Sequence, residues 1–169
     1  MIDFGFPKVL DQRTHTICGT PEYFAPEILL KTGYGKPVDW WTLGILIYEL
    51  LTGITPFADS DPIAIYKKIL NGKVKFPRTF DKDAKSLIKH LLTTDLAKRY
   101  GNLRRGVHDI KQHRWFSGFD WLGLLQKRTV MPYLPTPKSP YDTIDSGKYR
   151  DSISMPPAIN PTDDPFLDW

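Results

Sequence analysis

The chain has 169 residues, of which 41% are hydrophobic and 25% charged, and this is enough for one domain with a hydrophobic core. The composition excludes a disordered chain, a collagen-like repeat and a coiled coil. A single cysteine, Cys18, excludes an internal disulfide, so we expect a reducing compartment, the cytoplasm or the nucleus. The first residues have no signal-peptide pattern, and the longest apolar run, at 43–51, is too short to span a membrane.

Charge is distributed unevenly along the chain. Residues 1–130 carry 20 Lys and Arg against 13 Asp and Glu, whereas residues 131–169 carry 3 against 6 and hold 8 of the 15 prolines. We therefore expect a basic globular body followed by an acidic, proline-rich tail that extends over another surface. The basic residues of the body are scattered at helix-surface spacing, as in Lys82, Lys85 and Lys89, so no nucleic-acid partner is predicted.

The first third of the chain is predicted to combine a long irregular segment with one central helix. Residues 3–37 are rich in Gly, Pro and Thr and lack periodicity, apart from a short helix expected to begin at Pro26 and end near Lys31. Residues 38–51 are apolar on nearly every face and stop at Gly53, which predicts a helix buried on all sides at the centre of the domain.

Four further helices are predicted downstream. Asp61 is an N-cap for a helix that ends at residues 71–72, and either Asp81 or Asp83 begins the next one. That helix buries an apolar stripe made of Ala84, Leu87, Ile88, Leu91 and Leu92. Further helices are expected at 107–113 and 121–127, and no convincing strand pair is found. The resulting set of five or six helices predicts a mainly α fold.

Several short motifs, in a fixed order, point to chemistry. Asp-Phe-Gly occupies residues 3–5 and Ala-Pro-Glu residues 25–27, with a threonine-containing segment between them. Val-Asp-Trp-Trp at 38–41 and Lys-Arg-Tyr-Gly-Asn at 98–102 follow. In this order the motifs resemble serine/threonine protein kinases of the AGC group, above all the cAMP-dependent type, with the cGMP-dependent type second. The resemblance extends over essentially the whole chain, to the aromatic ending at 166–169.

This resemblance implies the C-terminal, large-lobe portion of the protein-kinase fold, without the small lobe. Residues 1–116 would belong to the kinase domain, with the activation segment at 3–27 and the helical core at 28–116, and residues 117–169 to an extended AGC tail. ATP and Mg²⁺ are the implied cofactors. Asp3 matches the aspartate that holds Mg²⁺ against the nucleotide phosphates, a ligand set that suits a hard cation.

The resemblance also assigns roles within the activation segment. Thr16 matches the phosphorylation site, and Lys8 and Thr14 match two partners of its phosphate, which adds about −1.5 to −2 charges. Thr20 matches the threonine that contacts the catalytic loop and favours Ser or Thr as the phosphoacceptor.

A substrate-binding set follows from the same resemblance. Glu49, the acidic residue within the apolar helix, matches the acceptor of a substrate arginine two residues before the phosphoacceptor, and Glu22 adds a more distant contact. An alternative remains open, in which Glu49 bonds only to Tyr23 or to a backbone amide. The pocket for the residue after the phosphoacceptor is matched by three apolar residues, Ile17, Pro21 and Phe24.

Other matched residues are structural. Glu27 and Arg99 match a buried ion pair that ties the activation segment to the helical core. Asp39 matches the aspartate that anchors the catalytic loop, and the alternative is a helix N-terminal acid stabilised by the helix dipole. Phe166 and Trp169 match the aromatic anchors of the tail. The four histidines are predicted to be surface or loop residues: His15, His90, His108 and His113.

The implied partners are protein substrates with basic residues before the phosphoacceptor and a cyclic-nucleotide-binding regulatory subunit. However, the 169 residues contain no glycine-rich phosphate loop, ATP-binding strand lysine, catalytic aspartate base or second metal-binding asparagine. We therefore predict negligible kinase activity for the chain alone. Two hypotheses remain: part of an active kinase, or a non-catalytic binding module that keeps the docking groove. A reading frame upstream of Met1 that encodes the other motifs would favour the first, and a stop codon there the second.

Overall fold

The computed structural model describes residues 5–10 and 12–133, so the predictions for Asp3, Phe166 and Trp169 lie outside the described residues. The chain divides into two units, residues 1–119 and 120–169, and each is described by itself. The mainly α prediction is confirmed for the described residues, which form six α-helices and two 3-10 helices. Their one β-type pairing is an isolated antiparallel bridge between Thr14 and Tyr34.

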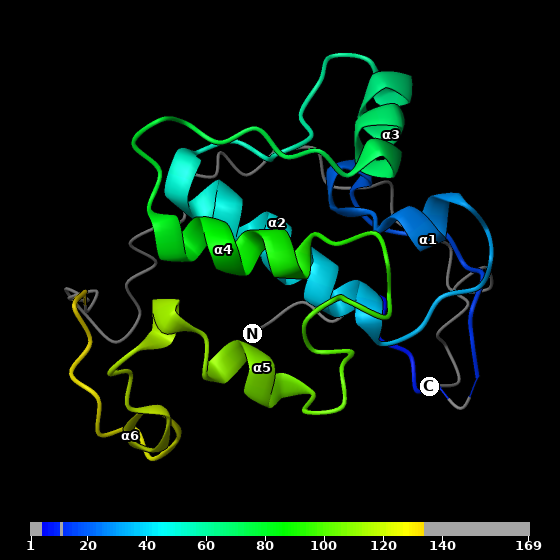
Figure 1. Ribbon diagram of the computed structural model, residues 1–169. Helices are drawn as coiled ribbons and strands as arrows, with labels where there is room; N and C mark the ends of the chain where they lie inside the picture. Colours follow the sequence, from blue (N-terminus) through cyan, green and yellow to red (C-terminus); the bar gives the residue numbers. More distant parts are fainter. Residues whose placement is uncertain (1–4, 11, 134–169) are drawn as a thin grey trace, which may run out of the picture. The chain divides into compact units, whose positions relative to one another are not determined.

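The helices follow the predicted order. In the first unit they are η1 (Pro21–Tyr23), α1 (Pro26–Leu29), α2 (Pro37–Thr52), α3 (Pro62–Asn71), α4 (Lys82–Leu91), α5 (Val107–Lys111) and η2 (Arg114–Phe116) (Figure 1). The second unit contains α6 (Trp121–Leu125). Proline occupies the first position of η1 and of each helix from α1 to α3, where its missing N–H costs nothing.

Side-chain caps decide where the middle helices begin. The Asp61 carboxylate accepts a hydrogen bond from the Ile63 amide at 3.0 Å, and Asp81 accepts one from the Ala84 amide at 2.7 Å. Of the two predicted starts for α4, Asp81 is therefore the observed N-cap. Each cap satisfies an amide that the helix itself leaves without a partner.

Three helices end earlier than predicted. α1 stops at Leu29 rather than Lys31, because Lys31 itself is left-handed with φ of 54°. α6 stops at Leu125 rather than Lys127, which has φ of 57°, and α5 ends at Lys111. Left-handed non-glycine residues are uncommon and carry no sequence signature, so these two ends could not be predicted.

The core of the first unit is built on the contact between α2 and α4, which lie side by side in Figure 1. Gly44 of α2 makes the close approach possible, because a Cβ there would lie 2.8 Å from a Leu92 methyl carbon and 2.9 Å from the Leu91 Cβ. The predicted stripe of α4 is buried, and Trp41 of α2 stacks on Phe57 with ring centroids 5.8 Å apart.

The prediction that α2 is buried on all sides is wrong. Trp41 and Ile45 are fully buried, but Leu46 is 42%, Leu50 75% and Leu51 48% exposed. An apolar sequence on every face indicates only that the helix can be buried all round. Within the described residues, neighbours cover one side of α2 and leave a second apolar side open.

The prediction that the four histidines are surface or loop residues does not fit His90, which is half-buried within α4, whereas His113 does lie in the loop between α5 and η2. His90 lies on α4 and stacks on Tyr100 with ring centroids 4.2 Å apart, and its Nδ1 lies 2.8 Å from the Ser86 carbonyl oxygen. His113 accepts a hydrogen bond from the Trp115 amide and places Nε2 3.1 Å from the Ser86 hydroxyl. The tertiary contact between α4 and η2 thus brings together two histidines that are far apart in the sequence.

No helix among the described residues is long and apolar enough to cross a membrane.

Candidate functional site

A buried ion pair joins the end of the irregular segment to the helical core. Arg99 Nη1 donates to Glu27 Oε1 at 2.6 Å and Arg99 Nη2 to Glu27 Oε2 at 3.0 Å. The arginine side chain is fully buried and the glutamate side chain is 8% exposed. Two parallel charge-assisted hydrogen bonds fix both the distance and the relative orientation of the two groups.

The remaining donors of Arg99 bind backbone carbonyls that the sequence analysis did not identify. Nε donates to the Thr93 carbonyl at 2.9 Å and Nη1 to the Pro37 carbonyl at 3.1 Å. The guanidinium also lies over the Trp41 ring, 5.1 Å from its centroid. Carbonyl acceptors carry no residue-type signal, so only the structure could find them. Arg99 thereby connects α1, the start of α2 and the loop after α4.

Glu49 and Tyr23 form the second interaction of the site. Glu49 is half-buried near the end of α2, and its carboxylate accepts a hydrogen bond from the Tyr23 hydroxyl of η1. This hydrogen bond, then burial and the negative charge of Glu49, raise the pKa of Tyr23 to about 12. The Tyr23 contact named in the alternative reading is therefore present, and Tyr23 holds a carboxylate that is open to solvent on one side.

The predicted apolar pocket residues differ in burial. Phe24 is 6% exposed and belongs to the hydrophobic core, Pro21 is half-buried, and Ile17 is 49% exposed. Glu22 lies beside Tyr23 in η1 and is half-buried. The structure thus places Pro21, Glu22 and Tyr23 on one short helix, with Phe24 as its anchor in the core.

The residues of the predicted activation segment lie around the isolated bridge between Thr14 and Tyr34. Lys8 Nζ donates to Thr14 Oγ1 at 2.9 Å, and Thr14 is buried and exchanges both backbone hydrogen bonds with Tyr34 at 2.9 Å. The Tyr34 hydroxyl donates to the Thr16 carbonyl, while Thr16 itself is exposed. Lys8 and Thr14 are therefore in contact, and the exposed Thr16 follows Thr14 by two residues in the sequence. Tyr34 was not identified from the sequence.

Thr20 and Asp39 are exposed, and the structure brings neither to the ion pair. Thr20 is the N-cap of η1 without a side-chain hydrogen bond, although its carbonyl accepts from the Tyr23 amide at 3.0 Å. Asp39 lies in the first turn of α2, where a negative charge interacts favourably with the helix dipole. Within the described part of the chain, no hydrogen bond or ion pair is formed by the Asp39 carboxylate.

The described residues do not form a metal-binding site, because they contain no group of three or more His, Cys, Asp or Glu side chains that could hold an ion. Asp3, the residue predicted to hold Mg²⁺, lies outside the described residues. Its carboxylate suits a hard cation, but no geometry supports a step through it.

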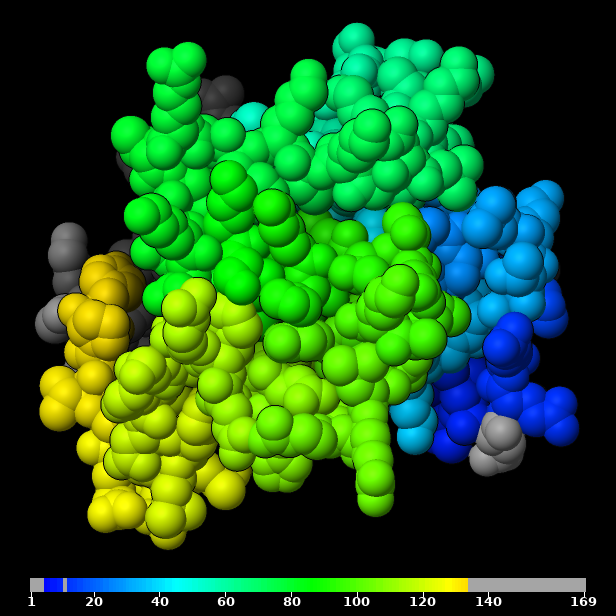
Figure 2. Space-filling view, in the orientation of Figure 1, coloured from blue at the N-terminus to red at the C-terminus, as the bar shows by residue number. Residues whose placement is uncertain are grey.

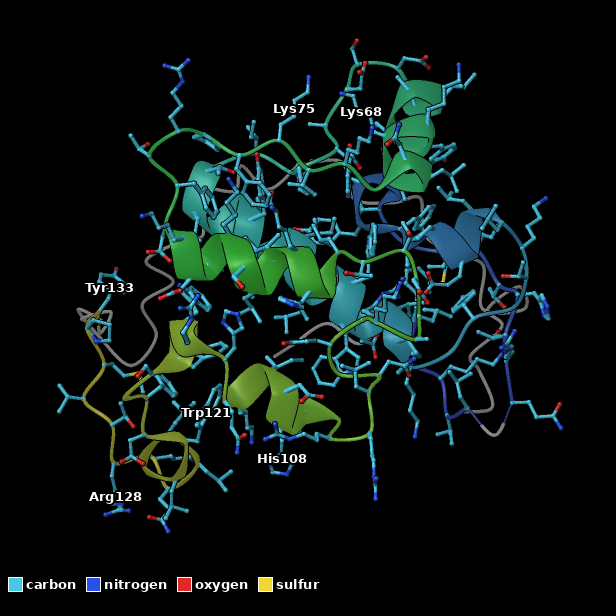
Figure 3. All side chains as sticks on the ribbon, viewed as in Figure 1. Lys68, Lys75, His108, Trp121, Arg128 and Tyr133 are labelled. Atoms are coloured by element: carbon cyan, nitrogen blue, oxygen red, sulfur yellow. The ribbon has the colours of Figure 1, made fainter. Side chains whose placement is uncertain are left out.

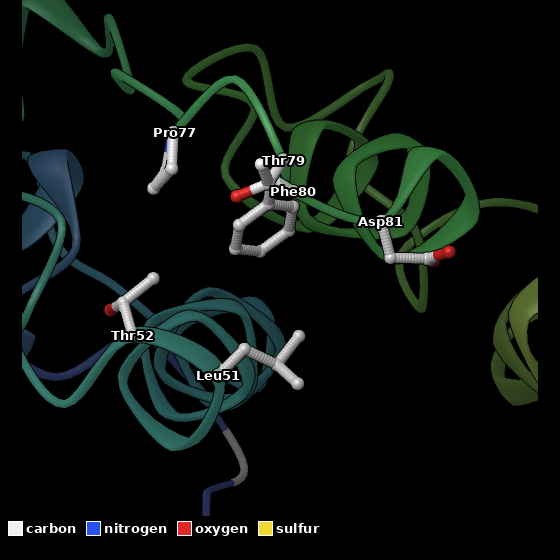
Figure 4. A pocket seen from close by; sticks show the side chains of 6 residues that line it. All are labelled: Leu51, Thr52, Pro77, Thr79, Phe80 and Asp81. Atoms are coloured by element: carbon white, nitrogen blue, oxygen red, sulfur yellow. The ribbon is translucent and has the colours of Figure 1, made fainter.

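A hollow of about 350 Å³ lies between the end of α2 and the segment before α4 (Figure 4). Leu51, Thr52, Pro77, Thr79, Phe80 and Asp81 line it. None of these is a predicted site residue, and the one titratable group, Asp81, already caps α4. The hollow is therefore separate from the candidate site.

Comparison with known proteins agrees with the motifs. The family model for the protein kinase domain matches residues 1–116. The chain belongs to the protein kinase family. The matched residues include the buried ion pair, the Tyr23–Glu49 contact and the predicted activation segment, so the whole candidate site lies within the matched region.

The curated relatives of this kinase chain confirm the resemblance to AGC-group kinases of the cAMP-dependent type. The chain is 50% identical over 163 residues to a cAMP-dependent protein kinase catalytic subunit of Dictyostelium discoideum, covering 95% of this chain and 25% of the relative. It is 47% identical over 152 residues to the human cAMP-dependent protein kinase catalytic subunit PRKX, covering 90% of this chain and 42% of the relative. The Drosophila melanogaster catalytic subunit 3 is 50% identical over 154 residues, 91% of this chain and 26% of the relative.

The chain therefore spans less than half the length of each of these three relatives.

Proposed function

We propose that this chain is the activation-segment and substrate-docking portion of an AGC-group serine/threonine kinase of the cAMP-dependent type. The complete enzyme transfers the γ-phosphoryl group of ATP to Ser or Thr in polypeptides that carry an arginine two residues before the acceptor. Names of the relatives support the cAMP-dependent type, and the substrate preference is supported by Glu49.

The main support for this proposed function is the partly exposed carboxylate of Glu49. Its carboxylate is the one acidic group within α2 beyond the first turn, and Tyr23 occupies one oxygen while the side chain remains half-exposed. A guanidinium can therefore approach the other oxygen without displacing Tyr23. Charge-assisted hydrogen bonds of this kind are about twice as strong as neutral ones. Glu22 lies beside Tyr23 in η1 and is proposed to add a second, more distant acidic contact for the substrate.

An enzyme that catalyses phosphoryl transfer mainly positions the reacting groups and neutralises the charge of the phosphates. Mg²⁺, held by Asp3 in this proposal, supplies neutralisation of the nucleotide phosphates. In the described residues, the Glu27–Arg99 pair holds the end of the activation segment on the helical core. Thr20 and Asp39 keep exposed side chains for the catalytic loop of the complete kinase, and Ile17, Pro21 and Phe24 shape the pocket after the phosphoacceptor.

A chimera tests the substrate assignment. The matched portion of the Dictyostelium catalytic subunit is replaced by this chain, and phosphorylation of an arginine-containing peptide is compared with that of its Arg→Ala analogue. We expect the arginine peptide to be preferred, and Glu49→Gln to raise its KM about 10-fold, since a charge-assisted bond is lost. The matched control, Glu22→Gln, should change KM less.

The isolated chain gives an independent measurement, because it does not require the chimera to be active. Its affinity for the arginine peptide should fall about 10-fold with Glu49→Gln. Equal binding of the arginine and alanine peptides would contradict the assignment of Glu49.

Thr16 is proposed as the activating phosphorylation site. Thr16 is exposed. Thr14, two residues earlier in the sequence, accepts a hydrogen bond from the Lys8 ammonium. A phosphate on Thr16 would recruit Lys8 and order the segment. Protection of residues 8–20 from proteolysis should increase on phosphorylation, and Lys8→Gln should remove the gain.

The 169-residue chain alone is expected to have negligible kinase activity, and phosphorylation of a basic peptide by the purified chain would contradict this. A cyclic-nucleotide-binding regulatory subunit is the proposed partner, and the cytoplasm or the nucleus the proposed compartment. A pull-down with and without cAMP or cGMP distinguishes control by either nucleotide from a non-catalytic module that lacks such control.

A further inference from the structure

A lysine-rimmed apolar groove lies on α4 and the extended segment that precedes it. A hollow of about 370 Å³ is lined by Gly72, Lys73, Val74, Phe76, Lys89 and Leu92. Leu92 is buried, Val74 and Phe76 are half-buried against the core, and Lys73 and Lys89 are exposed. None of these residues belongs to the proposed kinase site.

The extended segment alternates apolar and basic side chains, and this alternation builds the groove. Val74 and Phe76 turn inward while Lys73 and Lys75 are exposed, as the period of an extended backbone requires. The Lys75 carbonyl accepts a hydrogen bond from the Tyr48 hydroxyl at 2.8 Å, which fixes the segment on α2. Figure 3 shows the Lys75 side chain pointing away from the helices.

α4 contributes a second row of positive charge. Lys82, Lys85 and Lys89 recur at intervals of three and four residues and therefore share one face of the helix. The Lys85 ammonium lies 5.2 Å from the centroid of the Phe76 ring, so the two rows meet at the apolar floor. This part of the chain lies on the face shown in Figure 2, where several long side chains stand off the surface.

The positive charge of the groove is not neutralised within the described residues. Residues 72–92 contain six Lys and Arg and two acidic residues, a balance of +4. Both carboxylates are already engaged, Asp81 with the α4 N-terminus and Asp83 with Arg114 at 3.2 Å. Neither Lys73 nor Lys89 forms an ion pair with any described residue.

We propose that this groove is a docking site for an acidic polypeptide segment that carries one large apolar side chain. The concave apolar floor accepts the apolar side chain, and the lysines on both rims pair with flanking carboxylates. A membrane surface or a nucleic acid could pair with the lysines but would leave the apolar floor without an occupant. The preference is opposite to that of the proposed basic substrates, so the groove would recruit a different segment.

Fluorescence anisotropy with the 169-residue chain tests the proposal. The probe is a labelled peptide of one Phe flanked on each side by aspartates, compared with the same peptide carrying Ser in place of Phe. We expect saturable binding of the Phe peptide, about 10-fold tighter than the Ser peptide. Binding should weaken as ionic strength rises.

Charge-reversal variants locate the site. Lys73→Glu/Lys89→Glu should weaken binding of the Phe peptide about 10-fold or more, whereas Lys36→Glu/Lys67→Glu, with the same change in net charge at exposed positions outside the groove, should change it less than about 3-fold. Unchanged far-UV circular dichroism confirms that the variants fold.

The proposal would be overturned by a lack of saturable binding, by equal binding of the Phe and Ser peptides, or by equal losses of affinity in both double variants. Phosphatidylserine vesicles or a single-stranded oligonucleotide that displace the peptide, with the same dependence on Lys73 and Lys89 and a higher affinity, would overturn it in favour of a membrane or nucleic-acid surface. Because no phosphoryl transfer is measured, the result is independent of the proposed kinase function.

Discussion

At the scale of single residues, the site depends on two carboxylates in different environments. Glu27 is buried and holds both oxygens on Arg99, so its role is to fix the chain. Glu49 is half-exposed and is held through Tyr23, so it can still bind a cation from solution. Burial, rather than residue type, separates the structural acid from the acid that is proposed to bind a substrate arginine.

Breaking the buried pair should be costly. Glu27→Ala leaves the fully buried Arg99 without its anion, and we expect the free energy of unfolding to fall by about 3–5 kcal/mol. Urea denaturation measures this loss. The control Lys98→Ala removes a solvent-exposed ion pair with Asp95 and should cost at most about 1 kcal/mol. Similar losses in both variants would contradict the assigned burial.

The pKa of Tyr23 reports the contact with Glu49. Folding raises the pKa of Tyr23 from 10.0 to about 12, so the contribution of this group to stability is fully present below pH 10 and is lost as pH rises toward 12. Glu49→Gln removes the main cause, and ultraviolet titration should then show one tyrosine that ionises nearer pH 10. The Tyr23→Phe variant assigns this ionisation to Tyr23, because the transition near pH 12 seen in the unmodified chain should be missing from its titration curve. A Glu49→Gln titration identical to that of the unmodified chain would contradict the assignment.

At the scale of elements, the fold depends on how closely α2 approaches α4. Gly44 lies at this contact. A Cβ added to it would come within 3 Å of Leu91, at the end of α4, and of Leu92, which follows it. Helix propensity alone would favour alanine at this position. Glycine is present because the tertiary contact leaves no space for a methyl group.

Gly44→Ala should therefore destabilise the chain although alanine is the better helix former. We expect a loss of about 1–3 kcal/mol from overpacking, measured by thermal or urea unfolding. Gly35→Ala is the matched control, because its nearest neighbour would lie 3.9 Å away at Pro37. A stabilised Gly44→Ala variant would show that the two helices can move apart without cost.

The packing of η2 on α4 should depend on pH. Burial, followed by the nearby charge of His90, lowers the pKa of His113, with Asp83 acting in the opposite direction and Arg114 in the same one. Because the folded state favours neutral His113, its contribution to stability is present above the unfolded pKa of about 6.5 and is lost as pH falls below it. The loss has a structural cause, since His113 Nδ1 accepts the Trp115 amide only when unprotonated.

Nuclear magnetic resonance titration checks this directly. The His113 ring should titrate below pH 6.5, and His90→Asn should raise its pKa. A His113 pKa at or above 6.5 would contradict the packing described.

At the scale of the whole molecule, the described residues carry apolar surface that their own core does not use. Leu46, Leu50 and Leu51 of α2 are exposed, in a helix whose other side forms the centre of the core. The relatives are at least twice as long as the matched region. We expect this face of α2 to be covered in a complete kinase of the family, because apolar patches of this kind mark contact surfaces.

Leu50→Gln tests this expectation. In the 169-residue chain, where Leu50 is 75% exposed, the free energy of unfolding should change by less than about 0.5 kcal/mol, and self-association measured by sedimentation should decrease. Ile45→Gln, on the buried side of the same helix, should cost several kcal/mol. A large decrease in the free energy of unfolding for Leu50→Gln would show that the Leu50 side chain is already packed in the 169-residue chain.

The sequence by itself determined the family, the order of the helices and the Asp61 cap of α3, and it narrowed the cap of α4 to Asp81 or Asp83, because capping and kinase motifs depend on residue type at short, fixed spacing. Glu27 and Arg99 could be named as a pair only through the resemblance. The tertiary structure decided which side of α2 is covered, where the helices end in left-handed residues, and which carbonyls accept from Arg99. It also decided the pairing of His90 with His113 and the meeting of two lysine rows over Phe76. These features join residues distant in the chain or involve backbone atoms common to all residues, so no local pattern encodes them.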